Sequence, residues 1–303
     1  MKAIEIQITE CPRDAMQGIK EWIPTEHKVR YLNALLDCGF DVLDFGSFVS
    51  PKAIPQMQDS ATVLAQLTDS KTKLLAIIAN SRGAFDAAQH ERIALLGYPF
   101  SISETFQLRN TNSTLEQALF QLDEIAAICS TNNKQLRIYL SMGFGNPYGD
   151  AWSAEIVAQW IDKLQQRFEI AEFALSDTIG CATPELAQAL FSNLTEQYIE
   201  TRFAAHLHVV RGREEALIEA SVEGGCRHFD TAIGGYGGCP MAKDELTGNL
   251  ATEALILGSS SVIYKHHVDL QAFEAARSFS TSIFNKWETK NYFGLSGFFL
   301  RYW

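Results

Sequence analysis

The chain has 303 residues, 47% of them hydrophobic and 20% charged, and its formal net charge is −11. This composition excludes a disordered chain, a collagen-like repeat and a coiled coil, and no uncharged apolar run approaches the roughly 20 residues that cross a bilayer. The negative charge argues against nonspecific binding to nucleic acid or to anionic membranes, because the field around the protein repels phosphate. We therefore expect a soluble globular protein without a secretory or transit peptide.

Short apolar, β-branched or aromatic runs alternate with helical patterns along most of the chain. The runs predict eight strands, at residues 3–9, 41–46, 73–79, 98–103, 137–142, 170–176, 202–208 and 227–233. Their starts lie roughly 25 to 40 residues apart, which is the length of a strand, a crossover helix and two loops. The clearest helical patterns lie between them, at residues 25–38, 113–130, 153–167, 183–198 and 212–223.

Several of these helices begin with a recognisable start signal. Ser113 or Thr114 precedes one helix, Ser153 precedes another, and Pro184 follows Thr183 as a first-turn proline. Hydroxyl side chains at these positions accept hydrogen bonds from the free backbone N–H groups of the first turn, and proline suits the first helical position.

Eight strand and helix units fit a closed (β/α)8 TIM barrel better than an open doubly wound sheet. The open sheet usually has fewer strands, and its G-x-G-x-x-G turn is absent after the first strand, where residues 10–14 read Glu-Cys-Pro-Arg-Asp. After about Gly258 the alternation ends, so we predict that residues 259–303 form a helical C-terminal extension packed on the barrel. The whole chain, 1–303, is then a single domain, with an aromatic tail at 292–303 that packs or contacts a second subunit.

The six cysteines are scattered, without the C-x-x-C spacing of a zinc knuckle or the density of a small disulfide scaffold. We therefore expect a reducing, cytoplasmic compartment, in which most of these thiols are small buried apolar groups.

A TIM barrel places its catalytic groups at the carboxyl ends of the strands. Any one polar residue there can be an ordinary cap or turn residue, so the clustering over several strands is the informative feature. The residues at the predicted ends are Arg13, Asp14, Asp44, Asn80, Glu104, Ser141, Asp177, Thr178, His206, His208 and Thr231.

A metal site is predicted from the pair His206 and His208, which share one face of a strand because side chains alternate with a period of two. Two histidines at this spacing can also be core or surface residues, but Asp14 and Asn249 follow other strands and supply oxygen ligands. This mixed nitrogen and oxygen set suits Mg²⁺ or Mn²⁺ and is compatible with Zn²⁺ or Fe²⁺.

A glycine-rich loop, Gly-Gly-Tyr-Gly-Gly-Cys-Pro at residues 234–240, follows the eighth strand. Such a loop is often only a tight connection, but four glycines let the backbone approach a ligand closely. Cys239 in this loop, beside a cation site, is a candidate acid in catalysis.

Seven motifs in one order resemble hydroxymethylglutaryl-CoA lyase, a metal-dependent member of the barrel family that also contains isopropylmalate synthase. The combination of Ser-Phe-Val-Ser-Pro-Lys with Pro-Gln-Met and Gly-Gly-Cys-Pro is specific to this lyase. The motifs are Pro-Arg-Asp at 12–14 with Gln17, residues 47–52 with 55–57, Ser103-Glu104 with Asn110 and Asn112, residues 177–180, His206-x-His208, residues 237–240 and residues 248–253.

The resemblance implies metal-dependent retro-Claisen cleavage of 3-hydroxy-3-methylglutaryl-CoA, or a close 3-hydroxyacyl-CoA, to acetyl-CoA and acetoacetate. It implies a homodimer whose partner is the acyl-CoA substrate, and the expected metal and compartment stay Mg²⁺ or Mn²⁺ and the cytoplasm. The implied metal ligands are Asp14, His206, His208 and Asn249; the implied catalytic residues are Arg13, Cys239, Asp177, Asp44 and His206. The implied substrate-binding residues are Gln17, Ser47, Lys52, Glu104, Asn110 and Thr178.

Four positions depart from the family pattern. Val209 follows the histidine pair where aspartate is usual, Asp44 replaces a glutamate, Thr9 replaces an acidic residue and Asn146 replaces a common cysteine. Two alternatives therefore stay open: a condensing acyl-CoA synthase of the same barrel family, and a noncatalytic relative retained as a binding partner. The roughly 45 residues after Gly258 are too few for the extra domain that such synthases usually have.

Overall fold

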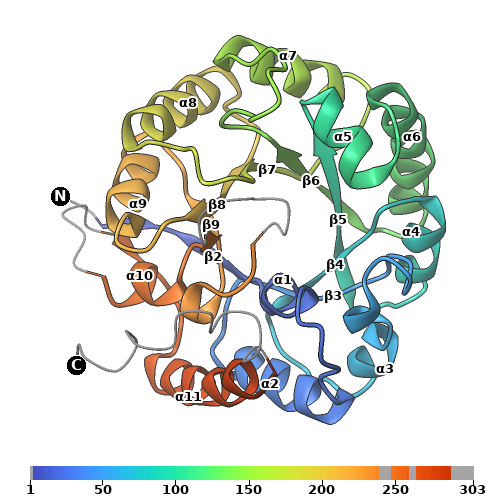
Figure 1. Cartoon of the computed structure of the whole chain (residues 1–303), viewed down its shortest axis with the longest axis vertical. Helices are drawn as coiled ribbons and strands as arrows, with labels where there is room; N and C mark the ends of the chain where they lie inside the picture. The colour runs from blue at the N-terminus through green and yellow to red at the C-terminus, as the bar shows by residue number, and fades with distance from the viewer. Residues whose placement is uncertain (1–2, 239–246, 259–263, 288–303) are drawn as a thin grey trace.

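The computed structural model describes residues 3–238, 247–258 and 264–287, and in them eight parallel strands close into a barrel surrounded by helices (Figure 1). Closure is visible in β9, which pairs in parallel with both β2 and β8 through the same residue, Phe229. The predicted (β/α)8 barrel is therefore confirmed. The barrel strands are β2 (Gln7–Glu10), β3 (Val42–Ser47), β4 (Lys73–Ile77), β5 (Ile93–Ser101), β6 (Gln135–Ser141), β7 (Glu172–Asp177), β8 (Phe203–Val209) and β9 (His228–Thr231).

All five predicted helices are present, and the start signals act as expected. Thr114, rather than Ser113, caps its helix through a capping box with Gln117, and Ser153 and Thr183 each accept a first-turn N–H. The helices are α1 (Pro12–Gln17), α2 (Thr25–Asp37), α3 (Ser60–Leu64), α4 (Ser81–Ala88), α5 (Glu104–Thr111), α6 (Leu115–Thr131), α7 (Ala154–Gln165), α8 (Pro184–Gln197), α9 (Glu214–Glu223), α10 (Thr252–Ile256) and α11 (Leu270–Trp287).

The fourth barrel strand, β5, begins at Ile93, five residues before the predicted start at residue 98. Gly97, which reads as a break in the sequence, lies inside the strand, and a Cβ there would approach Ile77 Cδ1 to 2.7 Å and Tyr139 Cε2 to 2.9 Å. Glycine is needed at this point because two large side chains of the barrel interior pack against the backbone.

The helix predicted after the barrel is present as α11, and a short strand precedes it. A short strand, β11 (Tyr264–Lys265), pairs in parallel with β1 (Ile4–Glu5), so the first predicted strand divides between this pair and β2. Helix α11 follows and packs beside α2, where Tyr31 stacks on Phe279 at 6.2 Å (Figure 1). The aromatic tail at 292–303 lies outside the described residues.

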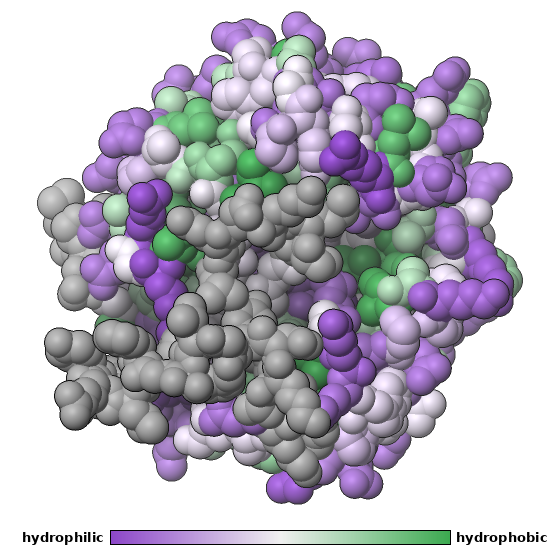
Figure 2. All heavy atoms as spheres, viewed as in Figure 1, coloured by the Kyte–Doolittle hydropathy of each residue, from purple (hydrophilic) through white to green (hydrophobic). Residues whose placement is uncertain are grey.

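Two environments fill the interior of the molecule. Apolar side chains occupy the space between strands and helices, whereas the inside of the barrel also holds buried ionisable groups, among them Arg137, Glu172 and Asp230. Hydrophilic side chains dominate the outer rim of the face shown in Figure 2. Among the described residues, no helix is long and apolar enough to cross a membrane.

Candidate metal centre

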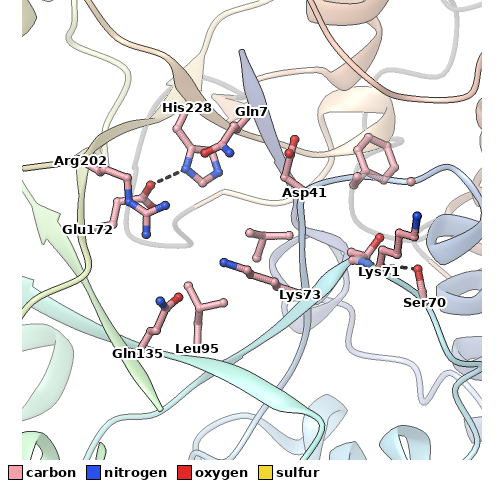
Figure 3. Close-up of a pocket in the computed structure, with 14 residues that line it drawn as sticks. Gln7, Asp41, Ser70, Lys71, Lys73, Leu95, Gln135, Glu172, Arg202 and His228 are labelled. Carbon is pink, nitrogen blue, oxygen red and sulfur yellow. Dashed lines mark hydrogen bonds and ion pairs between the residues drawn. The ribbon is translucent and has the colours of Figure 1, made fainter. Parts of the chain in front are cut away.

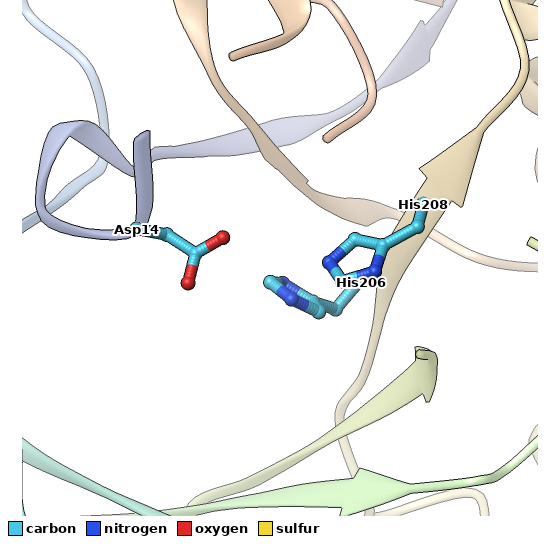
Figure 4. A group of neighbouring side chains, drawn as sticks. All are labelled: Asp14, His206 and His208. Carbon is cyan, nitrogen blue, oxygen red and sulfur yellow. The ribbon is translucent and has the colours of Figure 1, made fainter. Parts of the chain in front are cut away.

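The carboxyl ends of β2 and β8 bring three predicted metal ligands together. Asp14 lies on α1, which begins directly after β2 with Pro12 in its first turn, and His206 and His208 face Asp14 from β8 (Figure 4). Possible ligand atoms of these three side chains lie within 4.8 Å of one another. The fourth, Asn249, pairs with His208 across an antiparallel bridge, and its Nδ2 donates to Asp14 Oδ2 at 2.7 Å.

Each histidine of this pair is oriented by a contact at its Nδ1 atom. His206 Nδ1 lies 3.1 Å from Asp230 Oδ2, and His208 Nδ1 lies 3.0 Å from the backbone carbonyl oxygen of Thr178. Such contacts fix the ring orientation and leave Nε2 available to a cation.

The site passes a direct test of fit for a divalent cation. His208 Nε2 is buried and has no hydrogen-bond partner among the described residues, although buried polar atoms are nearly always paired. Burial and the neighbouring His206 lower the pKa of His208, so its ring is neutral and can donate a lone pair. Burial opposes ionisation of Asp14, yet Arg13 and the two histidines hold its pKa below the usual value. A carboxylate and two imidazoles are a donor set that binds divalent metals.

Arg13 is held beside the candidate metal ligands by two carboxylates. Its Nε and Nη2 donate to Asp44 Oδ2 at 3.0 and 2.6 Å, and its Nη1 donates to Asp14 Oδ1 and Gln17 Oε1, both at 2.9 Å. These contacts use four of the five guanidinium N–H groups, so one on Nη2 has no partner among the described residues. Burial raises the pKa of Asp44 to about 6, against the opposing effect of Arg13.

Three further predicted residues, Asp177, Thr178 and Ser47, have structural contacts of their own. The carboxylate of Asp177 accepts backbone N–H groups of Cys181 at 3.0 Å and Ala182 at 2.7 Å, so both of its oxygens hold the loop after β7. Thr178 orients His208 through its carbonyl, as described above, and the Ser47 hydroxyl donates to a backbone carbonyl at 3.3 Å.

The remaining predicted substrate residues, Lys52, Glu104 and Asn110, are exposed and have no contact with the ligand group among the described residues. Cys239 itself lies outside the described residues. The described start of its loop approaches the site closely: a Cβ at Gly237, whose φ is +88°, would lie 2.7 Å from Asn249 Nδ2 and from the backbone oxygen of Asp14. Only glycine fits there.

An ionic chain inside the barrel was not predicted from the sequence. Asp230 contacts His206 with one oxygen and Arg137 Nη2, at 2.6 Å, with the other. Arg137 Nε also pairs with Glu172 Oε1 at 3.0 Å, and Glu172 contacts His228 Nδ1. Burial opposes the ionisation of Asp230, but Arg137 and His206 hold its pKa far below the usual value. The available signals were Arg137 between two apolar residues in Leu-Arg-Ile and two ionisable residues on either side of a phenylalanine in His-Phe-Asp.

Tyr139 is a second residue that the sequence reasoning missed. Its ring meets His206 edge-on at 5.3 Å, and its hydroxyl is buried without a hydrogen-bond partner among the described residues. Tyr139 was visible only as one aromatic residue of a predicted strand, which is a common core residue.

Two of the departing positions, Thr9 and Val209, have defined places in the structure. Thr9 Oγ1 lies 2.8 Å from His228 Nε2 and accepts a hydrogen bond from Arg137 Nη1 at 3.0 Å, so it completes the ionic chain without adding a charge. Val209 is buried and pairs with Gly248 in the short strand that also carries Asn249.

Comparisons with known proteins agree with this geometry. Residues 5–279 match a family model described as HMGL-like. The 3-hydroxy-3-isohexenylglutaryl-CoA/hydroxymethylglutaryl-CoA lyase of Pseudomonas aeruginosa is 31% identical over 86% of both chains. The hydroxymethylglutaryl-CoA lyase of Bacillus subtilis is 31% identical over 88% of both chains. A solved HMG-CoA lyase from Acinetobacter baumannii, in complex with coenzyme A and 3-methylmalate, aligns with a TM-score of 0.85 at 29% identity, covering 94% of this chain and 93% of that one.

Proposed function

Because the chain belongs to the HMGL-like family and its relatives are lyases, we propose that it is a divalent-metal-dependent carbon–carbon lyase acting on 3-hydroxy-3-methylglutaryl-CoA or a close 3-hydroxyacyl-CoA. The products from 3-hydroxy-3-methylglutaryl-CoA are acetyl-CoA and acetoacetate. The observation that supports this proposal most strongly is the convergence of Asp14, His206 and His208 next to a guanidinium with a free N–H.

Asp14, His206, His208 and Asn249 would hold the metal. When bound, the cation supplies Lewis acidity that lowers the pKa of the tertiary hydroxyl of the substrate. Asp230 keeps the ring of His206 in one orientation through its 3.1 Å contact with Nδ1. The protein therefore presents its donors in fixed positions before substrate arrives.

Arg13 is placed to stabilise the charge that develops during cleavage. Loss of the hydroxyl proton lets the carbon–oxygen bond become a ketone, the adjacent carbon–carbon bond breaks, and its electron pair moves into the thioester enolate. The free Nη2 N–H of Arg13 would donate to that enolate oxygen, with Asp14 and Asp44 holding the guanidinium in place.

Two proton transfers complete the reaction. Asp44, whose pKa burial raises to about 6, is a candidate to accept the hydroxyl proton, with Asp177 and His206 as further candidates. We assign Cys239 to delivering a proton to the enolate carbon, which yields acetyl-CoA. Gln17 is held in the cluster by Arg13 and Asp14, and we propose that it and Ser47, Lys52, Glu104, Asn110 and Thr178 contact the acyl-CoA.

The proposal also covers the identity of the metal, the domain organisation, the oligomeric state and the location of the protein. We propose Mg²⁺ or Mn²⁺ as the metal, because oxygen and imidazole donors suit these ions. We also propose one barrel domain, a homodimer and a cytoplasmic location; the relatives include both mitochondrial and cytoplasmic enzymes.

The test is a substrate panel assayed with the same metal-loaded protein. We expect release of acetoacetate from 3-hydroxy-3-methylglutaryl-CoA, with 3-hydroxy-3-isohexenylglutaryl-CoA as the comparison substrate. In a parallel assay with acetyl-CoA and a 2-oxo acid, we expect no release of free CoA. Release of CoA without any cleavage activity would instead support the synthase alternative.

A further inference from the structure

A polar cavity of about 340 Å³ lies at the end of the barrel opposite the metal ligands. Six of its lining residues are the first residues of their strands: Gln7, Val42, Lys73, Gln135, Glu172 and His228. Since all barrel strands run in parallel, these residues mark the amino-terminal mouth of the barrel (Figure 3). We call this space the amino-terminal cavity.

Cationic side chains without acidic partners line this cavity. Figure 3 shows Lys73 and Arg202 extending into the space, with Lys71 at its rim. In the part of the chain that the structure describes, none of these three cations lies within ion-pair distance of a carboxylate; Arg202 Nε only approaches the backbone oxygen of Ala171 at 3.4 Å. In a chain of net charge −11, unpaired cations in a concave surface create a local attraction for anions.

The two acids of the cavity are already engaged. Glu172 contacts Arg137 and His228, and Asp41 Oδ2 accepts the backbone N–H of Ile8 at 2.9 Å. The charge of Glu172 is therefore balanced by Arg137 in the barrel wall, and one oxygen of Asp41 is turned toward the backbone of β2, whereas Lys73 and Arg202 remain available.

Neutral hydrogen-bond groups in the same cavity also lack partners. Thr72 is 7% exposed, and its Oγ1 is buried with no partner among the described residues. The side-chain amides of Gln7 and Gln135 likewise make no hydrogen bond within the described ranges. Buried polar atoms are nearly always paired in folded proteins, so a ligand oxygen would give the buried Thr72 hydroxyl the partner that it lacks. Gln7 and Gln135 are exposed and would add amide donors at the surface of the cavity.

We propose that the amino-terminal cavity is a binding site for a small organic anion bearing carboxylate or phosphate groups. Arg202 offers the planar fork that pairs with either group, and Lys73 supplies a point charge beside it. An adjoining cavity of about 330 Å³ shares Gln7, Asp41, Glu172, Arg202 and His228, so the space admits a metabolite-sized molecule. This site is distinct from the proposed lyase centre at the other mouth.

The test is calorimetric titration of the metal-loaded protein with succinate and, separately, with inorganic phosphate, at low ionic strength. We expect saturable binding of one anion per chain, at least tenfold weaker in Lys73→Gln/Arg202→Gln. The matched control is Arg82→Gln/Lys163→Gln, which removes the same charge from exposed positions on α4 and α7 and should bind as the wild type does. Comparing the two anions identifies the preferred group.

Arg13→Gln separates this cavity from the lyase centre, because it removes the cation there and should leave anion binding unchanged. Arg202→Gln alone provides a milder variant if the double variant does not fold, and it should also weaken binding. The proposal is overturned if the wild type binds neither anion, if cavity variants bind both normally, or if Arg13→Gln abolishes binding. None of these readouts depends on cleavage activity, so the proposal stands or fails separately from the lyase function.

Discussion

Asp230 contacts both the candidate metal site and the buried ionic chain, because each of its two oxygens has a different partner. One oxygen orients the ring of His206, a proposed metal ligand, and the other pairs with Arg137. Removing one member of a buried charged group leaves its partner unpaired, which is strongly destabilising. A variant of Asp230 therefore changes both folding stability and the metal site, and the two effects need separate measurements.

We predict that Asp230→Asn weakens Mn²⁺ binding by about 10- to 100-fold, the usual effect of losing a residue that orients a metal ligand. Glu172→Gln is the matched control, since Glu172 also pairs with Arg137 but does not contact His206. It should lower the unfolding midpoint in urea and leave Mn²⁺ affinity within about twofold. Equal loss of Mn²⁺ affinity in both variants would show that Asp230 has no specific positioning role.

Cys239→Ala should leave Mn²⁺ affinity and substrate affinity nearly unchanged and lower turnover by roughly 100-fold or more, the scale expected for one positioned acid. Cys181→Ala is the control. Cys181 is an exposed residue. Partial burial of its thiol group and the nearby Asp177 raise the pKa of the thiol to about 12, so almost no thiolate forms at neutral pH. Iodoacetamide should therefore inactivate the wild type and Cys181→Ala alike, with substrate protecting both. Normal turnover in Cys239→Ala would make this cysteine a bystander.

At the scale of elements, hydrophobic runs were sufficient to predict every barrel strand, because the parallel barrel buries both faces of each strand. The start of β5 was missed because Gly97 interrupts its hydrophobic run. In the structure this glycine lies inside the strand, where two large side chains pack against the backbone. The four proposed metal ligands were predictable because they lie at or just after the carboxyl ends of strands. The Asp230–Arg137 pair was not, because it joins β9 to β6 across the barrel, and spacing along the chain does not reveal contacts between distant strands.

Glu10, at the end of β2, ties this strand to two later segments. Its Oε1 accepts the backbone N–H of Ile233 at 2.8 Å, and its Oε2 accepts the hydroxyl of Thr252 at 2.6 Å. Burial raises the pKa of Glu10 from 4.5 to about 8. The folded protein therefore binds a proton that the unfolded chain releases between these pH values, and its contribution to stability falls as pH rises through that window.

We predict that Glu10→Gln flattens this pH dependence, since glutamine stays neutral at every pH. In urea titrations, the free energy of unfolding of Glu10→Gln should rise relative to that of the wild type as pH increases from about 5 to about 8.5. Glu91→Gln, at an exposed loop position, should run parallel to the wild type. A constant difference between Glu10→Gln and the wild type across this range would mean that Glu10 is ionised throughout.

At the scale of the whole molecule, the two mouths of the barrel have separate chemistry joined by one buried chain of contacts. The proposed metal ligands lie at the carboxyl ends of the strands. Lys73 and Arg202, which have no ion-pair partner within the described residues, lie at the amino ends. The chain of contacts that runs from His206 through Asp230, Arg137 and Glu172 to His228 lies between them in the barrel interior. Acyl-CoA is anionic and the protein has a net charge of −11, so we propose that local cations such as Arg13 contribute to substrate binding.

A dimer is expected from the family resemblance, and light scattering after size exclusion tests it. The native mass should be twice the 33.7 kDa of one chain. A mass of 33.7 kDa at micromolar concentration would contradict the dimer without affecting the proposed chemistry.

The most direct test of the lyase proposal is product formation from 3-hydroxy-3-methylglutaryl-CoA by protein stripped with a chelator and then reloaded with Mg²⁺ or Mn²⁺. We predict no turnover in the stripped protein and, on reloading, equal amounts of acetyl-CoA and acetoacetate. His206→Ala should bind metal more weakly and recover little of this activity, since it lacks one of the proposed ligands. Full activity in the stripped protein, or no cleavage by the reloaded wild type, would contradict the assignment of Asp14, His206, His208 and Asn249 as the metal site of a lyase.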